Sequence, residues 1–278
     1  MGYGGGYRRD RSVKNEGEKN SATGSRESGD DSAWKEAATE ATEPSLNISA
    51  KRITRALIFA AVLLTLASFV VGTVALLEGP FVRLFYVGSD LSVPAWYSAL
   101  VLALASVLLF TVAFVVGSGE SPRYARRWAV LGIIFAYLSC DEMLRLHERL
   151  ASTVIVPALE SLGFMPGGII YYPWVLIYTP LVILFVMAYF RFWRELPART
   201  RTLFLAAGAI FVGGALGVEL FNAYHDAAGG REPLVIAGTH LEEFMEMVGV
   251  VIFVHAILSY IGSHLRVRAL RLCFEPGR

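Results

Sequence analysis

The amino-acid sequence predicts an all-α, polytopic membrane helix bundle with about six transmembrane helices and a disordered N-terminal tail. Three observations lead to this fold class: an apolar composition, six long apolar stretches, and basic residues that are concentrated in alternate connections. Of the 278 residues, 55% are hydrophobic and 18% are charged. Soluble domains are about 45–50% apolar and about 25% charged, so both values indicate that lipid is the solvent.

The N-terminal segment differs in composition from the rest of the chain. Residues 1–50 are rich in Gly, Ser, Glu, Lys and Arg and contain almost no aliphatic side chains. Such a segment cannot bury enough apolar surface to fold. We therefore expect a disordered cytoplasmic tail at 1–50, a six-helix transmembrane domain at 51–270 and a short cytoplasmic tail at 271–278.

Six stretches have the length and apolarity of a transmembrane helix. A bilayer core of about 30 Å is crossed by about 20 residues, because an α-helix rises about 1.5 Å per residue. The third stretch is apolar only over its first two thirds. The six stretches cover about residues 53–77, 95–116, 128–147, 171–192, 203–224 and 240–265.

Basic residues indicate the orientation of these helices. They gather before the first stretch, between the second and third, between the fourth and fifth, and after the sixth. These residues are Lys51, Arg52, Arg55, Arg123, Arg126, Arg127, Arg191, Arg194, Arg199, Arg201, Arg266, Arg268 and Arg271. The remaining connections carry only Arg83, Arg145, Arg149 and Arg231. By the positive-inside rule, we expect a multi-pass protein of the cell membrane with both termini in the cytoplasm.

Acidic residues and histidines gather at the predicted non-cytoplasmic ends of the third, fifth and sixth stretches. Ionisable groups are costly inside a membrane and usually face a partner or a cavity. The third and fifth stretches share one pattern, in which an acid is followed by His six positions later and by another acid seven positions later. The candidate residues are Asp141, His147, Glu148, Glu219, His225, Asp226, His240, Glu243 and Glu246.

Helical geometry gives this pattern a chemical meaning. Residues seven positions apart lie nearly one above the other on an α-helix, so each pair of acids forms a stripe with the histidine on its flank. By the same geometry Glu142 points away from its stripe and is expected to pair with Arg145 or Arg149. The direction of Glu242 is less clear, because it lies close to Glu246 around the helix.

Carboxylate and imidazole groups together are typical ligands of Zn, Fe or Mn. Nine candidates exceed the needs of one tetrahedral ion, so we expect one or two divalent metal ions. Only two cysteines, Cys140 and Cys273, are present, which excludes a thiolate-rich site. A proton or cation site without a fixed metal and a purely structural polar network are the alternatives.

The favoured function is a metal-dependent enzyme, either a hydrolase or a di-metal oxidoreductase. Its substrate would be a membrane lipid or another hydrophobic molecule that enters between the helices. Glu246, the deepest acid, is the candidate general base. The alternative function is a proton- or cation-coupled transporter or channel, because acids inside a membrane often mark ion paths. No nucleic-acid partner is expected, and the oligomeric state is open.

Overall fold

A computed structural model gives the fold of the chain. It describes residues 49–73, 84–89, 91–119, 122–165, 167–168, 171–229 and 232–265. The elements within these ranges are all helices, which confirms the all-α fold class. The predicted tails fall outside the described residues, apart from the last two positions of the N-terminal one.

Among the described residues, five helices are long and apolar enough to cross a membrane, so the chain has the make-up of an integral membrane protein. Four of them are single elements near the predicted positions, and the fifth combines three consecutive elements. They are α2 (Ala50–Thr73), α4 (Val93–Gly117), α8 (Val175–Glu195), the continuous run of α9 (Ala198–Val212), η3 (Gly213–Val218) and α10 (Glu219–Ala227), and α11 (Glu232–His264).

The third predicted span corresponds to helix α5 (Pro122–Leu144). Its 23 residues would cover about 34 Å, enough to cross a bilayer core. It is not among the five because arginines occupy its first turns and two acids lie near its end. Three short elements follow it: α6 (Leu146–Leu150), η1 (Ala151–Ile155) and α7 (Val156–Ser161).

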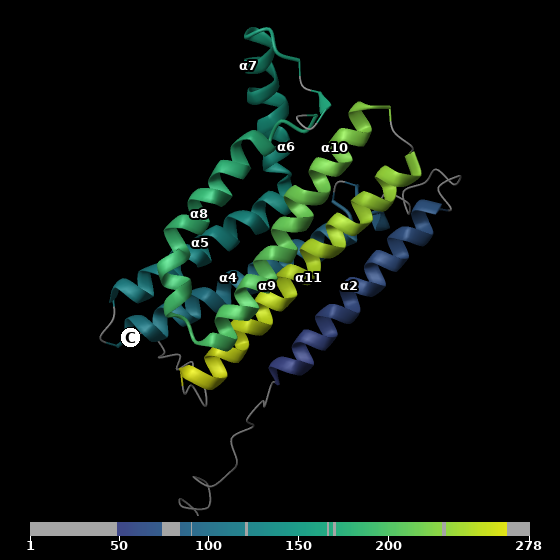
Figure 1. The fold of residues 1–278 in the computed structure, drawn as a ribbon. Helices are drawn as coiled ribbons and strands as arrows, with labels where there is room; N and C mark the ends of the chain where they lie inside the picture. The colour runs from purple at the N-terminus through teal and green to yellow at the C-terminus, as the bar shows by residue number, and fades with distance from the viewer. Residues whose placement is uncertain are drawn as a thin grey trace, which may run out of the picture. The chain divides into compact units, whose positions relative to one another are not determined.

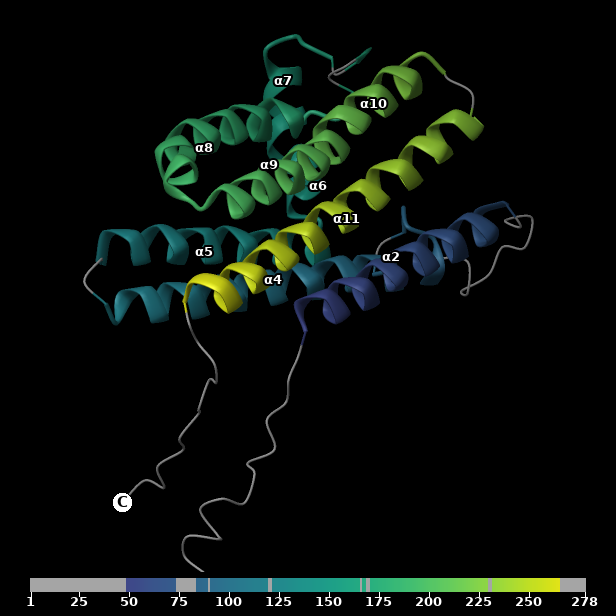
Figure 2. The same cartoon turned by 60° about the horizontal axis from the view of Figure 1, so that its bottom comes forward.

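Helix α11 is the central element of the bundle. It packs against α2, α4, α9 and η3, and Figures 1 and 2 show it between α2 and the α9–α10 run. Its residues Val251, Val254 and Ile257 are completely buried. Helix α4 pairs along its length with α5 beneath this layer. Helix α11 therefore joins α2, α4 and the α9–α10 run into one bundle.

Most of the residues of helix α8 are exposed. Only its two ends are anchored, by Val175 near the start and by Phe192 near the end. Between them the side chains of Leu181, Leu184 and Met187 are 52–67% exposed. An apolar helix with so much exposed aliphatic surface is typical of a helix that faces lipid.

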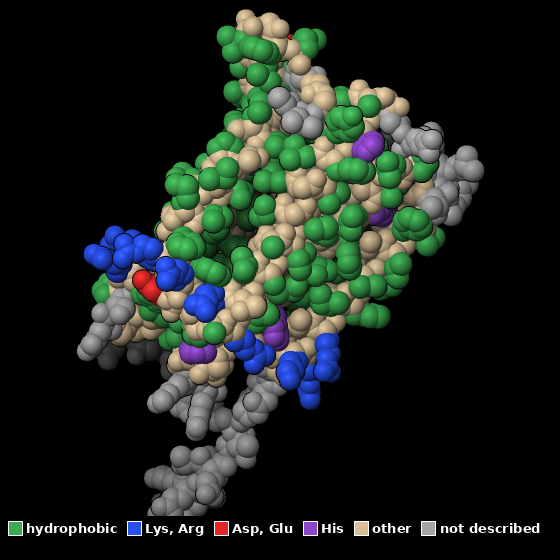
Figure 3. All heavy atoms as spheres, viewed as in Figure 1, with side chains coloured by type: hydrophobic (Ala, Val, Ile, Leu, Met, Phe, Trp, Pro, Cys, Tyr) green, Lys and Arg blue, Asp and Glu red, His purple; other side chains and the backbone are tan. Residues whose placement is uncertain are grey.

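The first residues of α2 and the last residues of α11 lie at the same end of the bundle (Figures 1 and 2). Lys and Arg side chains gather at this end, and apolar side chains cover the middle of the face shown in Figure 3. This distribution is the one that the positive-inside rule describes.

Small residues bring the α9–α10 run into close contact with α11. A Cβ atom built on Gly249 of α11 would lie 2.8 Å from the Cβ of Phe211 and 3.0 Å from the carbonyl oxygen of Ala207. A Cβ on Gly214 of η3 would lie 2.9 Å from the carbonyl oxygen of Glu242. Transmembrane helices approach this closely where glycine removes the side chain from the interface.

Candidate functional site

A left-handed residue, Arg145 with φ of 49°, interrupts the helix and separates α5 from α6. The backbone N–H of His147 then donates to Asp141 Oδ1 at 2.8 Å, and His147 Nδ1 lies 2.8 Å from Asp141 Oδ2. Asp141 is buried and holds both the start of α6 and the imidazole ring. The helix predicted to reach residue 147 therefore ends at Leu144, and this break creates the contact.

The start of α8 connects this histidine to α10. The ring of Trp174 packs edge-on against His147, with the ring centres 5.0 Å apart. Its indole N–H donates to Glu219 Oε1 at 3.2 Å. Two residues before Trp174, the hydroxyl of Tyr172 donates to Asp226 Oδ2 at 2.7 Å. Burial, and then the hydrogen bond to Asp226, raises the pKa of the Tyr172 hydroxyl, which stays a donor.

A contact between two acids joins α10 to α11. The carboxyl groups of Glu219 and Glu242 are in hydrogen-bonding contact with each other. The side-chain amide of Asn222, one turn after Glu219, donates to Glu242 Oε2 at 3.0 Å. Asn222 is itself buried against Gly238 of α11. Glycine at 238 is needed here because an added Cβ would overlap the asparagine side chain.

Further acids surround this pair. Glu246 lies within electrostatic range of Glu142, Glu219 and Asp141, which places acids of α5, α10 and α11 around one region. Glu243 interacts in the same way with Glu142 and Glu219. We call the six residues Asp141, Glu142, Glu219, Glu242, Glu243 and Glu246 the carboxyl cluster. Asp141 is buried and the other five are half-buried.

The positive charge near the carboxyl cluster comes from Arg145. Its guanidinium forms an ion pair with Glu148 at 3.0 Å and interacts over a longer range with Glu142 and Glu243. Six carboxyl groups thus share one arginine and the adjacent His147 among the described residues. The cluster as a whole cannot carry all its negative charges without added protons or cations.

Two of the three predicted histidines lie away from the carboxyl cluster. His240 is buried on the side of α11 that faces α2, where its Nε2 lies 3.0 Å from Ser68 Oγ and its Nδ1 lies 2.8 Å from the carbonyl oxygen of Ile236. His225 packs against Phe221 of its own helix, with ring centres 4.3 Å apart. The three histidines therefore do not face one common space.

Helix geometry explains these two positions. At 100° per residue, Glu242 and Glu246 lie about 40° apart on α11, and they lie about 160° and about 120° around the helix from His240. In α10 the helix continues without a break after Glu219, so His225 stays six positions along it. On α5 the same spacing separates Asp141 from His147, and the two side chains meet only because the helix is interrupted at Arg145.

The remaining predicted residues have different surroundings. Glu148 is exposed and pairs with Arg145, and Asp226 accepts its hydrogen bond from Tyr172. Within the described part of the chain, no group of three or more His, Cys, Asp or Glu side chains is arranged to hold a metal ion. The predicted ligand set is thus brought together only in part.

Sequence reasoning did not select four residues that complete the site: Glu142, Glu242, Asn222 and Trp174. Glu242 could have been found, because it shares a helix face with Glu246 one turn away. Asn222 stands one turn after Glu219 on the same face, a signal of the same kind. The contact of Trp174 with Glu219 joins residues 45 positions apart, and no local pattern encodes it.

Comparison with known proteins places the chain in a family. Residues 56–261 match the family described as "Domain of unknown function (DUF8692)", so the chain belongs to this family. The matched segment begins within α2 and ends within α11, and it includes the three spans between them and the whole carboxyl cluster. No curated protein and no solved structure matches the chain at a significant level.

Proposed function

We propose that this member of the DUF8692 family binds protons or cations at the carboxyl cluster and couples their binding to transport across the membrane. The observation that carries the proposal is the contact between the carboxyl groups of Glu219 and Glu242. Two ionised carboxylates in contact repel each other, so the pair needs a proton or a cation between them. A site that holds an exchangeable proton inside a membrane is the central part of a proton-coupled protein.

The depth of the carboxyl cluster supports this function. Glu246 stands about 21 Å along α11 from Glu232 and about 27 Å from His264, at 1.5 Å per residue. It therefore lies near the middle of the helix, whereas Glu242 lies closer to the Glu232 end of α11 and Glu219 lies closer to the Ala227 end of the α9–α10 run. The acids form a series that leads from one end of the bundle toward its centre.

The other half of the bundle is closed in the described conformation. The ring of Trp128 on α5 packs against Phe192 and Tyr260, with ring centres 5.0 Å and 5.2 Å apart. All three side chains are buried. Transport past this aromatic layer requires α5 and α11 to separate there, so we propose that the described conformation is open to protons only from the acidic end.

We further propose that α5 crosses the membrane as a sixth span. This count places both termini on the basic side, in the cytoplasm, and the carboxyl cluster toward the opposite side. The proposal rests on the length of α5, on its pairing with α4, and on the arginines at its first turns.

A metal-dependent enzyme is the second candidate, and one observation favours it. Asp141 holds His147 through Nδ1, which leaves Nε2 to face outward, 3.9 Å from Glu148 Oε1. Carboxylate-oriented histidines of this kind are common among metal ligands. A catalytic zinc uses three protein ligands, and the described residues bring only His147 and Glu148 to this point. Zn, Fe or Mn would bind here only with a further ligand.

Carbodiimide labelling separates the two functions. Dicyclohexylcarbodiimide reacts with protonated carboxyl groups in apolar surroundings, so we expect it to modify Glu219 or Glu242 in the purified full-length protein. Exposed Glu160 and Glu195 are the internal controls and should stay unmodified. Protection by Na⁺ or K⁺ would indicate a competing cation, and protection by Zn²⁺ or Mn²⁺ that requires His147 would favour the enzyme. Absence of label from peptides that cover 219–246 would contradict the proposal.

A further inference from the structure

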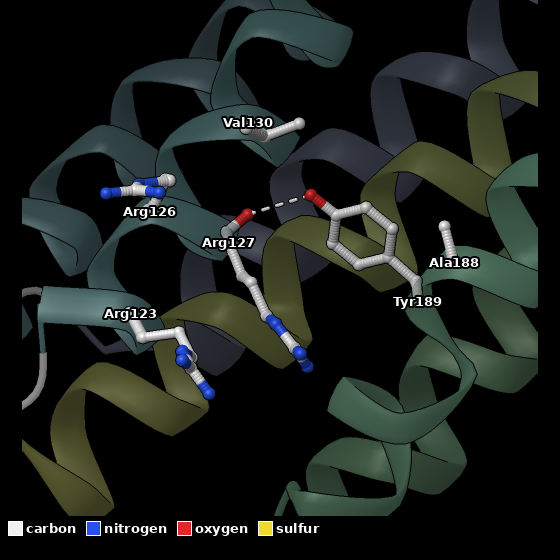
Figure 4. A pocket seen from close by; sticks show the side chains of 6 residues that line it. All are labelled: Arg123, Arg126, Arg127, Val130, Ala188 and Tyr189. Atoms are coloured by element: carbon white, nitrogen blue, oxygen red, sulfur yellow. Dashed lines mark hydrogen bonds between the residues drawn. The ribbon is translucent and has the colours of Figure 1, made fainter.

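A small pocket lies at the basic end of the bundle, between α5 and α8 and far along both helices from the carboxyl cluster. It has a volume of about 180 Å³ and is lined by Arg123, Arg126, Arg127, Val130, Ala188 and Tyr189. Figure 4 shows the Arg123 and Arg127 side chains extending in the same direction, as expected for residues four positions apart on a helix. The pocket thus presents two guanidinium groups side by side.

Arg127 is held in place at two points. Its carbonyl oxygen accepts a hydrogen bond from the hydroxyl of Tyr189 at 3.0 Å, which also joins α5 to α8 (Figure 4). Its guanidinium lies over the ring of Phe192, 5.9 Å from the ring centre. These contacts fix the backbone and one face of the guanidinium of a residue that lines the pocket.

The hydrogen-bonding capacity of Arg127 is not used by the described residues. Its Nη1 atom is buried and has no hydrogen-bond partner among them. The ion pairs of the described residues do not include Arg123, Arg126 or Arg127. A buried donor without a partner is costly, and a guanidinium fork matches the oxygens of a phosphate group. The pocket therefore has the chemistry of a phosphate site.

The apolar part of the lining indicates how the phosphate is carried. Val130 and Ala188 stand one turn deeper than the arginines, on surfaces of α5 and α8 that are exposed in the bundle. Leu184 and Leu181 continue the exposed aliphatic surface of α8 toward the centre of the membrane. A phosphate attached to acyl chains can occupy the pocket while its chains lie along this surface. Basic pockets between transmembrane helices bind lipid headgroups in this manner.

We propose that the pocket binds the phosphate group of an anionic membrane lipid between Arg123 and Arg127. The site is separate from the carboxyl cluster and does not depend on the function proposed for it. A lipid bound here would lie beside the Tyr189–Arg127 hydrogen bond and would help to hold the basic ends of α5 and α8 together.

The test is a titration of the purified full-length protein, freed of lipid, with phosphatidylglycerol or phosphatidylcholine, followed by native mass spectrometry. We expect preferential binding of phosphatidylglycerol by the wild type and an affinity lower by roughly tenfold in Arg127→Gln. Arg127→Lys keeps the charge but loses the fork, so an intermediate affinity is expected. Arg199→Gln removes an exposed arginine of the neighbouring helix α9 and is the matched control, with unchanged affinity.

A second variant and a competition experiment complete the test. Because Arg127 is half-buried, its substitution can affect folding; Arg123→Gln changes an exposed residue and should weaken lipid binding without altering the unfolding temperature. Competition by inorganic phosphate at the lipid concentration would assign the site to free phosphate and overturn the lipid assignment. Equal losses in Arg127→Gln and Arg199→Gln, or no loss in either Arg123→Gln or Arg127→Gln, would overturn the site itself.

Discussion

Glu242→Gln is expected to reduce proton flux through reconstituted vesicles by roughly tenfold or more, because a loss of 1.4 kcal/mol in one step already gives this factor. An amide can neither take up nor release the proton that Glu242 shares with Glu219. Glutamine has nearly the same shape, and its oxygen can still accept the hydrogen bond from Asn222. The substitution therefore removes the acid–base chemistry and keeps the packing of α10 against α11.

The flux is measured with a pH-sensitive dye inside proteoliposomes, after gradients of protons, Na⁺ or K⁺ are imposed. Glu219→Gln should have the same effect, and the double variant should be hardly worse than either single one, because both residues serve one shared proton. Glu160→Gln, an exposed acid of α7, is the control and should keep the wild-type flux. A wild-type flux in Glu242→Gln, or no flux in the wild type under any gradient, would favour the enzyme instead.

Gly249→Ala is expected to destabilise the protein by about 1–3 kcal/mol, the usual cost of overpacking a close interface. The added Cβ would lie 2.9 Å from the backbone nitrogen of Phe211 and 3.0 Å from the carbonyl oxygen of Ala207. Both are backbone atoms, so neither can move aside without shifting α9. This shift would also move η3 and α10, and with them Glu219, away from Glu242.

Gly262→Ala on the same helix is the matched control. Nothing lies within 4 Å of the position that its Cβ would take. In an open helical position, alanine is more favourable than glycine by about 1 kcal/mol. Thermal unfolding in detergent should thus show opposite signs for the two variants. An equal gain in stability in both would mean that α9 and α11 do not pack as closely as described.

Much of the fold could be predicted because a membrane imposes strong rules on a sequence. The long apolar stretches correspond to α2, α4, α8, the α9–α10 run and α11, with shifts of several residues at their ends. The largest shift is at α11, which begins at Glu232 instead of residue 240. Pro233 in its first turn is compatible with a helix start, a signal that the apolar periodicity does not contain.

The position of the acids along their helices could be predicted from the sequence, but the neighbouring helix that each acid faces could not. Asp141, Glu219, Glu243 and Glu246 were expected near one another, and the structure brings them into one region. His240 was expected in the site and faces α2 instead, whereas Glu242 was not selected and faces α10. Only the packing of the helices decides which face of α11 meets α2 and which meets α10. The contact of His147 with Asp141 depends on the left-handed conformation of Arg145. Arginine rarely adopts this conformation, so the sequence does not predict it.

Infrared difference spectroscopy tests the central claim, that Glu219 and Glu242 share a proton, most directly. The purified protein is titrated from low to high pH, and the C=O stretching band of protonated carboxyl groups is followed in H₂O and in D₂O. The wild type should show a band of a hydrogen-bonded carboxylic acid that shifts in D₂O and is lost in both Glu219→Gln and Glu242→Gln, but remains in Glu160→Gln. If that band persists unchanged in both cluster variants, the two residues hold no common proton and the account is contradicted.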